Sequence, residues 1–354
     1  MNYRLVDQIA NAVLYEGYIL YPYRPSVKNR QRWTFGGLFP QSCSLAQDGS
    51  EPWRMQTECL VAGGPNTRLE IKVRFLHLLA RIVGELTPPG SELPTVGEPP
   101  FRPVPALRIG DRLYQTWEEA VERKVALGYL EVMDRATQPR RTAFAFPPGR
   151  EFELLPGPGG AFLGILVRQQ HGVAGEVEVF AEPLEDGLFK VSVAVANLTP
   201  LEEALPRCRE EAVLRALVST HTILSVSGGE FVSLLDPPEP WRDRAAACRN
   251  VGTWPVLVGE EGTRDTMLSA PIILYDYPQV APESPGDLFD ATEIDEILTL
   301  RILTLTEEEK QAMAAVDDRA RALLARTEAL AREQLAGLHG TVRNLRPVPG
   351  GGLP

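Results

Sequence analysis

The chain has 354 residues, a formal net charge of −11 and a hydrophobic fraction of 44%. Its length exceeds the size at which a single core usually keeps growing, so we expect two domains and an extension. The acidic balance argues against a general affinity for nucleic acid or anionic membranes, because both require clustered positive charge. No run of about 18 apolar residues predicts a membrane span, and Asp7 and Glu16 interrupt the N-terminal segment where a signal peptide would need an apolar run. Four scattered cysteines fit a reducing compartment, so we expect a cytoplasmic protein.

The N-terminal region, residues 1–86, is predicted to be β-rich. Segments 12–21 and 69–79 alternate partly between apolar and polar residues, and this pattern favours strands. The proline-rich segment 87–105 is typical of an extended, semi-rigid linker.

A helical insert is predicted after this linker, so that residues 87–150 form a linker and helical insert. Thr116 and Glu119 have the spacing of a capping box, which predicts a helix through about Leu127.

Residues 151–270 are predicted to form an α+β domain. Segments 175–181 and 188–196 alternate regularly around Asp186-Gly187, and an Asp-Gly pair supplies the positive φ angles of a tight hairpin. The other elements expected here are a helix at 207–220, strands at 223–226 and 230–234 joined across Gly228-Gly229, a helix at 241–249 and a strand at 255–258. No glycine-rich phosphate loop joins a strand to a helix, so we expect no nucleotide-binding parallel sheet and predict no cofactor.

Residues 271–340 are predicted to form an extended arm followed by helices. Asp290, Thr306 and Asp317 or Asp318 can each cap the start of a helix. Residues 341–354 lack an apolar period and are expected to be a disordered tail. The expected fold class is therefore α+β, with two β-rich regions, packed helices and a helical C-terminal extension.

Three carboxylates, Asp287, Asp290 and Glu293, form the nearest approach to a metal site. Acidic residues three apart on a helix can share a hard cation, and Asp295 and Glu296 extend the run. The alternative, which we favour, is that acidic residues in a first helical turn complement the helix dipole without a metal.

His221 and Cys248 are the candidate catalytic residues. His221 lies among hydroxyl side chains and is the best candidate general base; its alternative role is a cation at the end of a helix. Cys208, Cys248 and His221 could meet only through tertiary folding, and a buried structural role is the favoured alternative for each cysteine.

The candidate partner-binding residues lie in one basic loop of this acidic protein: Arg24, Lys28, Arg30, Arg32 and Trp33. Arginines beside aromatic residues can bind a carboxylate, a phosphate or an acidic peptide. The alternative is a solvated loop whose arginines pair with the protein's own acids.

Three stretches, residues 14–40, 247–259 and 275–310, resemble a family of bacterial proteins of uncharacterised biochemistry. That family is associated with gene clusters for actinobacterial-type, high-affinity NiFe hydrogenases. The resemblance covers most of the chain and implies a cytoplasmic accessory role in assembling, maturing or tethering hydrogenase subunits. It implies no reaction and no binding residues.

We therefore expect a non-enzymatic accessory or assembly factor that binds protein partners, such as hydrogenase subunits. A metal-dependent or hydrolytic enzyme and a structural subunit of a larger complex remain as alternatives.

Overall fold

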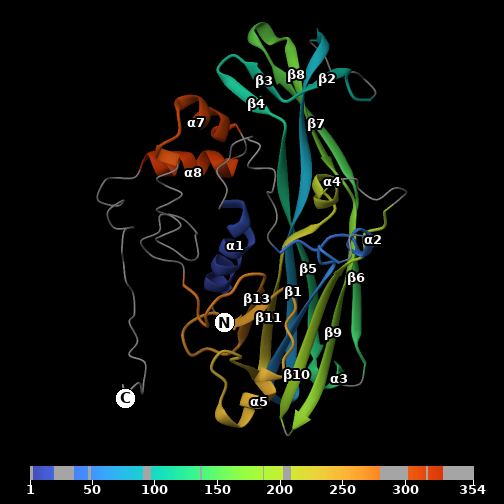
Figure 1. Ribbon diagram of the computed structural model, residues 1–354, viewed down its shortest axis with the longest axis vertical. Helices are drawn as coiled ribbons and strands as arrows, with labels where there is room; N and C mark the ends of the chain where they lie inside the picture. The colour runs from blue at the N-terminus through green and yellow to red at the C-terminus, as the bar shows by residue number, and fades with distance from the viewer. Residues whose placement is uncertain are drawn as a thin grey trace.

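The computed structural model describes residues 3–19, 36–46, 49–90, 97–135, 138–185, 187–201, 209–279, 302–315 and 318–329. This part of the chain is mostly antiparallel β-sheet with a few helices (Figure 1). The strands of the main, 11-stranded sheet are β1 (Arg54–Gly90), β2 (Phe101–Val104), β5 (Trp117–Glu131), β6 (Arg140–Phe146), β7 (Gly149–Pro156), β8 (Phe162–Gln170), β9 (Val173–Glu185), β10 (Leu188–Asn197), β11 (Leu217–Val232), β12 (Trp254–Leu257) and β13 (Thr266–Ala270). Strands β3 (Ala106–Ile109) and β4 (Arg112–Gln115) form a separate two-stranded sheet. The helices are α1 (Tyr3–Ile19), α2 (Gln41–Ala46), α3 (Val132–Arg135), α4 (Arg209–Val213), α5 (Arg242–Ala246), α7 (Glu307–Ala314) and α8 (Asp318–Glu328), with 3₁₀ turns η2 (Pro158–Gly160) and η3 (Glu239–Trp241).

Strand β1 is long enough to contribute to two layers. Its first part pairs with β10 and its later part pairs with β5, while β11 follows it through a register shift between Gly63 and Arg68. Thr67 stabilises this bend, because its hydroxyl donates to the Gly228 carbonyl at 2.8 Å and accepts from the Gly64 N–H at 2.9 Å. The outer layer, as we call it, comprises β6, β9, β10 and the first part of β1. The helix-bearing layer comprises β5, the later part of β1, β11, β13 and β12.

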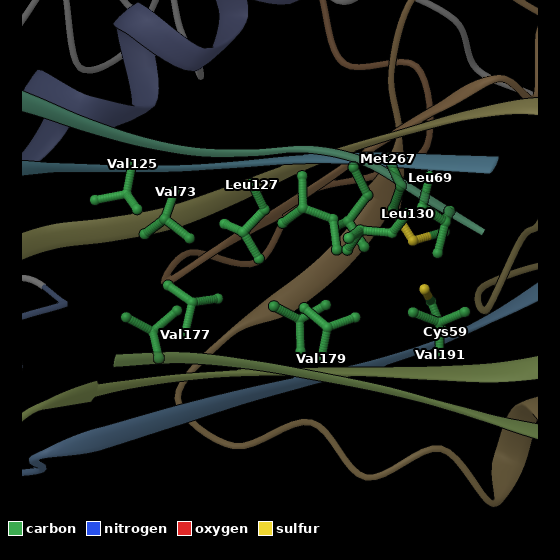
Figure 2. Packing of buried hydrophobic residues seen from close by; sticks show 14 of the residues in the cluster. Cys59, Leu69, Val73, Val125, Leu127, Leu130, Val177, Val179, Val191 and Met267 are labelled. Carbon is green, nitrogen blue, oxygen red and sulfur yellow. The ribbon is translucent and has the colours of Figure 1, made fainter. Parts of the chain in front are cut away.

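The main core fills the space between these two layers (Figure 2). Val73, Val125 and Leu127 extend from the helix-bearing layer toward Val177 and Val179 of the outer layer. These side chains alternate with outward-facing neighbours, as the two-residue period of a strand requires. Burial of such a face is the main stabilising term of a sheet sandwich.

Helix α1 covers the far face of the helix-bearing layer. Val6, Ile9, Ala10 and Val13 recur at the spacing of one helical face and are buried against β11, β12 and β13. Helices α7 and α8 lie further along the same side (Figure 1), where Leu323 packs in a cluster with strand and α1 residues. Helices α1, α7 and α8 therefore cover the helix-bearing layer, whereas α5 packs against Leu60 and Leu188 of the outer layer. Much of the outer layer's far face is left uncovered by the described residues.

Several local predictions are confirmed. Residues 69–79 lie in β1, and the predicted hairpin is β9 and β10, with φ = 73° at Gly187. The short strand at 255–258 is observed as β12, and part of the helix at 241–249 is observed as α5. Thr306 forms a capping box at the start of α7, with its hydroxyl accepting from the Glu309 N–H at 3.3 Å. Helix α8 begins at Asp318, as predicted.

Two predictions are wrong: the strand at residues 12–21 and the helix after Thr116. Residues predicted as a strand from position 12 belong to α1 through Ile19, and Val13 continues the helical period of Val6, Ile9 and Ala10 and packs with them on the sheet. The predicted helical insert after Thr116 is strand β5. The Thr116 hydroxyl donates to the Val104 carbonyl at 2.8 Å and accepts from the Val83 N–H at 3.0 Å, so it joins two strands and caps no helix.

Two predictions between residues 207 and 234 are also wrong. The helix predicted for 207–220 ends at Val213, because Leu217 and Val218 pair with β1 and begin β11. The two strands predicted around Gly228-Gly229 are one bent strand, in which Gly228 has φ = 71°. Long-range pairing with β1 overrides the local turn signal here.

Strands from residues 1–86, 87–150 and 151–270 all belong to the 11-stranded sheet. The linker predicted at 87–105 contributes β2, which pairs with β1. No helix in the described part of the chain is long and apolar enough to cross a membrane.

Candidate functional site

A hollow of about 250 Å³ lies on the uncovered face of the outer layer. Arg54 and Gln56 project into it from β1, Glu178 and Phe180 from β9, and Ser192 from β10. These are the outward positions of three adjacent strands, since their neighbours Met55, Val179 and Val193 point into the core. The alternation of side chains along each strand therefore brings polar residues from distant parts of the sequence to the same surface of the hollow.

A second hollow of about 360 Å³ adjoins the first one and shares Arg54 and Gln56 with it. Leu45 of α2 and Val251 border it, and 65% and 55% of their surfaces are exposed, respectively. Trp53 lies next to Arg54 in the same wall. We call the two hollows together the Arg54 groove.

The charges in the Arg54 groove form a chain across the sheet. The Arg54 guanidinium lies 3.7 Å from a Glu178 carboxylate oxygen, and the Arg141 guanidinium from β6 donates to the other oxygen at 2.6 Å. The Arg54 and Arg141 side chains are 44% and 66% exposed. Exposed pairs of this kind contribute roughly 0–1 kcal/mol to stability, so they leave the guanidinium groups available to another carboxylate.

The loop that carries Val251 is fixed to β1 by Glu58. One Glu58 carboxylate oxygen accepts from the Arg249 N–H at 2.7 Å, and the Glu58 N–H donates to the Asn250 side-chain oxygen at 2.8 Å. The Gln56 N–H donates to the Val251 carbonyl at 3.0 Å. The apolar border of the Arg54 groove is therefore held in place by strand-like pairing, as a preformed binding surface requires.

The sequence left open a role for His221 as a cation at the end of a helix. The structure does not place His221 at a helix end. It is fully buried in β11, where its Nδ1 lies 3.0 Å from the Ser219 carbonyl and its Nε2 has no hydrogen-bond partner within the described chain. The pKa of His221 is lowered to about 3, mainly by burial and also by the nearby Arg74 guanidinium, whereas the Ser219 carbonyl opposes this shift. A neutral imidazole without solvent access cannot meet a substrate, so this geometry gives His221 a structural place.

His77 is buried in β1, as its predicted strand position implies. Its Nε2 donates to the His171 carbonyl at 2.8 Å, which leaves Nδ1 as the acceptor for the Arg123 Nε–H at 3.5 Å. Burial is the main cause that lowers the pKa of His77 to about 4. His77 is therefore neutral and joins β1, β5 and the turn between β8 and β9.

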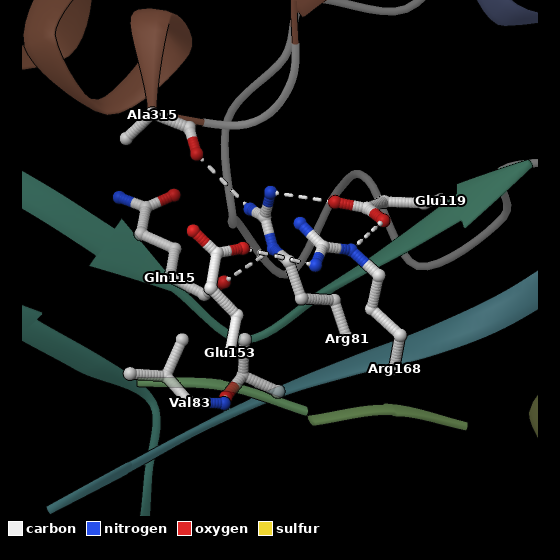
Figure 3. A network of polar contacts seen from close by, with 8 residues as sticks. Arg81, Val83, Gln115, Glu119, Glu153, Arg168 and Ala315 are labelled. Carbon is white, nitrogen blue, oxygen red and sulfur yellow. Dashed lines mark hydrogen bonds and ion pairs between the residues drawn. The ribbon is translucent and has the colours of Figure 1, made fainter. Parts of the chain in front are cut away.

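A buried ionic network links the sheet to the C-terminal helices (Figure 3). Arg81 donates to Glu119 at 2.9 Å and to the Ala315 carbonyl at the end of α7 at 3.0 Å. Arg168 joins Glu119 to Glu153, with distances of 2.9 and 3.1 Å. Burial lowers the pKa of Arg81 and its Glu119 partner opposes that shift, so the network holds its charges through mutual pairing. Its contacts indicate a structural role in docking α7.

The three cysteines that the structure describes are buried or half-buried, as a packing role requires. Cys43 and Cys59 are buried, and burial raises the pKa of both thiols. Cys248 is half-buried, and its pKa is raised to about 11 by burial and by the Glu58 carboxylate. Such thiols are poor nucleophiles near neutral pH. His221 lies under α1, in the other layer from the loop of Cys248, and within the described residues no three His, Cys, Asp or Glu side chains converge as metal ligands.

The other candidate residues from the sequence lie outside the described residues. They are the acidic run Asp287, Asp290, Glu293, Asp295 and Glu296, the basic loop Arg24, Lys28, Arg30, Arg32 and Trp33, and Cys208.

The Arg54 groove was not predicted from the sequence. Its signal is present but weak: Glu176, Glu178, Lys190 and Ser192 are the polar half of two alternating strands, and such residues usually face solvent. Only the pairing of β9 and β10 with β1 brings them beside Arg54.

Comparison of the chain with protein-family models and with curated proteins finds no match. The geometry of the Arg54 groove is therefore the basis for inferring a function.

Proposed function

We propose that this protein is a non-enzymatic accessory factor that binds a protein partner through the Arg54 groove. We assign its mostly β architecture, with its few packed helices, to the α+β class. The observation that carries the proposal is a preformed hollow in which Trp53 and Arg54 stand beside the exposed apolar residues Leu45 and Val251. Tryptophan and arginine are the residue types most enriched among energetically dominant interface positions.

The chemistry of the groove favours a polypeptide as the ligand. Leu45, Trp53 and Val251 provide apolar contact area, while Gln56 and Ser192 provide hydrogen-bonding groups. The Arg54 guanidinium can donate two parallel hydrogen bonds to a partner's carboxylate. An apolar centre with polar groups around it is the usual anatomy of a protein interface.

The partner class that we propose is a subunit of a NiFe hydrogenase, and the compartment is the cytoplasm. Support for this part comes from the sequence resemblance of residues 14–40, 247–259 and 275–310. The basic residues from Arg24 to Trp33 would add a second set of contacts to an acidic partner.

The proposal is tested by measuring the affinity of the purified chain for purified hydrogenase subunits by biolayer interferometry. Arg54→Glu should weaken binding by about ten-fold or more, because it places a second carboxylate beside Glu178 in the groove. Arg68→Glu is the matched control. Arg68 also lies in β1, is 55% exposed and pairs with Glu131 at 3.2 Å, but it belongs to the helix-bearing layer.

Equal binding by wild type and Arg54→Glu, with both proteins folded, would remove the groove from the interface. Absence of any binding by the wild-type chain would remove hydrogenase subunits as partners. Co-purification from the native host and identification of the bound protein would then name the partner directly.

A further inference from the structure

Strand β6 is the edge of the outer layer, and its free side carries unpaired backbone groups. It pairs with β9 over all seven residues from Arg140 to Phe146, and within the described residues no strand pairs with its other side. Figure 1 shows β6 along the margin of the molecule. A sheet edge of this kind is a template for another strand.

The direction of these backbone groups follows from the neighbouring hydrogen bonds. Ala174 of β9 accepts from the Leu198 N–H at 2.9 Å and donates to the Thr199 hydroxyl at 3.0 Å, so both of its backbone groups point away from β6. Ala145 lies opposite Ala174, and this pair is therefore a non-hydrogen-bonded one. The N–H and C=O of Ala145 must then point to the free edge.

The alternation of antiparallel pairing gives the same direction to the backbone groups of Arg141 and Ala143. The backbone groups of Thr142 and Phe144 point instead to β9. A strand added at this edge would pair with every second residue of β6 without disturbing its ladder to β9.

The side chains of β6 show a second sign of an unfilled edge. Its inward-facing residues Phe144 and Phe146 are only partly buried, although their partners in β9, Gly175 and Val173, are buried. Both phenylalanine rings pack around Phe75 of β1, with ring centroids 5.8 Å apart in each pair. The hydrophobic core therefore extends to the β6 edge, where the Phe144 and Phe146 rings remain partly exposed.

The edge strands β5 and β7 carry charged residues along their length, whereas the charged residues of β6 lie only at its start. The centre of β5 has Glu122, Arg123 and Lys124, and β7 begins with Arg150 and Glu151. Charged residues at an edge oppose pairing with another chain. From Thr142 to Phe146, β6 has no charged residue, no proline and no register shift against β9.

The charges around the edge define the partner. Arg141 is exposed, and Arg140 has no carboxylate within ion-pair distance among the described residues. Arg123 of β5 lies over the Phe146 ring, 4.7 Å from its centroid, on the inner side of the edge. Arg141, which also pairs with Glu178 at 2.6 Å, therefore provides a positive charge on the outer face of this edge, and Arg140 and Arg123 lie on its inner face, in a protein whose net charge is −11.

We propose that β6 accepts an extended segment of a partner protein as an added antiparallel strand, in which apolar residues alternate with acidic ones. The apolar side chains extend the core beside Phe144 and Phe146, and the acidic side chains lie on the opposite face of the sheet, beside Arg141. The inference rests on the proposed protein-binding function and specifies the conformation and charge of the bound segment.

The test uses two labelled, end-blocked peptides, VEVEVEV and VKVKVKV, and fluorescence anisotropy with the full chain. Wild type should bind the glutamate peptide about ten-fold or more tightly than the lysine peptide. Ala143→Pro should weaken binding of the glutamate peptide by about ten-fold or more, because proline removes an outward N–H and its ring obstructs the edge. Ala143→Val is the matched control, since it keeps the donor, and its affinity should stay within about two-fold of wild type.

Thermal unfolding establishes that Ala143→Pro is folded, and Ala145→Pro serves as a second variant at an equivalent position. Hydrogen exchange on the wild-type chain provides a measurement without any substitution. The amides of Ala143 and Ala145 should exchange fast alone and more slowly with the glutamate peptide.

Three results would overturn the inference: no saturable binding of the glutamate peptide, equal binding by Ala143→Pro, or unchanged exchange at Ala143 and Ala145. Sedimentation velocity could give a fourth result that overturns the inference. A wild-type dimer that Ala143→Pro converts to a monomer would assign the edge to a second copy of this chain.

The two binding proposals can fail separately. If Arg54→Glu loses the hydrogenase subunits while Ala143→Pro keeps the peptide, only the strand-addition inference fails. If Ala143→Pro loses the peptide while Arg54→Glu keeps the subunits, only the groove fails.

Discussion

The two buried histidines should make the protein unstable at mildly acidic pH. His221 and His77 have pKa values of about 3 and about 4 in the folded chain, mainly because burial disfavours the charged imidazolium. In the unfolded chain both should titrate near the ordinary histidine pKa of about 6.5. The folded pKa is the lower one, so the stabilisation is present above about pH 6.5 and is lost as the pH falls toward the folded pKa values.

The size of the effect follows from these values. At about pH 5 an unfolded histidine gains about 2 kcal/mol from protonation, whereas a folded one with a pKa of 3 or 4 gains almost nothing. The free energy of unfolding should therefore decrease by about 4 kcal/mol between about pH 8 and pH 5 for His77 and His221 together. That loss is a large part of the stability of a typical domain.

Urea unfolding followed by tryptophan fluorescence at these two pH values measures the effect. His221→Leu should remove about half of the pH dependence, because leucine has no proton to gain on unfolding. Carboxyl groups that titrate in the same range contribute equally to wild type and variant, so the difference between them isolates the histidine. His171→Gln, a substitution in the turn between β8 and β9, is the comparison for an incompletely buried histidine. An unchanged pH dependence in His221→Leu, or a titration of His221 near pH 6.5 in the folded protein, would refute the structural role.

Three further predictions concern a cap, a buried ion pair and the β6 edge. Thr306→Ala should destabilise the protein by about 1 kcal/mol through loss of the α7 cap, and a shift of the urea midpoint with an unchanged slope would show it; no shift would mean that α7 contributes little to global stability. Arg81→Met should cost about 2 kcal/mol, because the mostly buried Glu119 then keeps only Arg168 as a partner, and Glu119→Gln should cost less in this background than in wild type, as a double-mutant cycle measures; additive effects would contradict the coupling. In the free protein the amide of Phe144 should exchange much more slowly than that of Ala143, as measured by hydrogen exchange with residue-level fragmentation; the reverse order would contradict the assigned direction of the β6 backbone.

Elements defined by local chemistry were predictable from the sequence. The β9–β10 hairpin depends on alternation and a glycine with positive φ, and the start of α7 depends on the capping box of Thr306. Both signals lie within a few residues and act without distant contacts. The amphipathic repeat of α8 is local in the same way.

The same local signals failed where distant strands compete for the same residues. The capping-box spacing at Thr116 occurs in a segment that pairs along β1, and its hydroxyl bonds to two other strands instead. Gly228-Gly229 has the composition of a hairpin turn, yet it lies at the bend of one continuous strand because β1 bends beside it. Pairing partners as far apart as Arg81 and Trp117, or Val73 and Thr222, cannot be inferred from a window of about ten residues.

The Arg54 groove was unpredictable for a related reason. Each of its polar residues occupies a position where a solvent-facing residue is expected, and nothing in any single strand distinguishes Arg54 or Ser192 from such a residue. The register of β1 against β10, which places Gln56 opposite Ala194, is what assembles the floor. His221 was found by its residue type, but its burial depends on the packing of α1 over β11.

Site-specific photocrosslinking in the native host tests the central claim most directly. A benzophenone amino acid at position 45, on the exposed border of the Arg54 groove, should crosslink the chain to a partner protein. The same amino acid at Tyr129, which is 71% exposed on β5 in the helix-bearing layer, should not. A partner captured from position 129 and not from position 45 would contradict the assignment of the outer layer as the binding face.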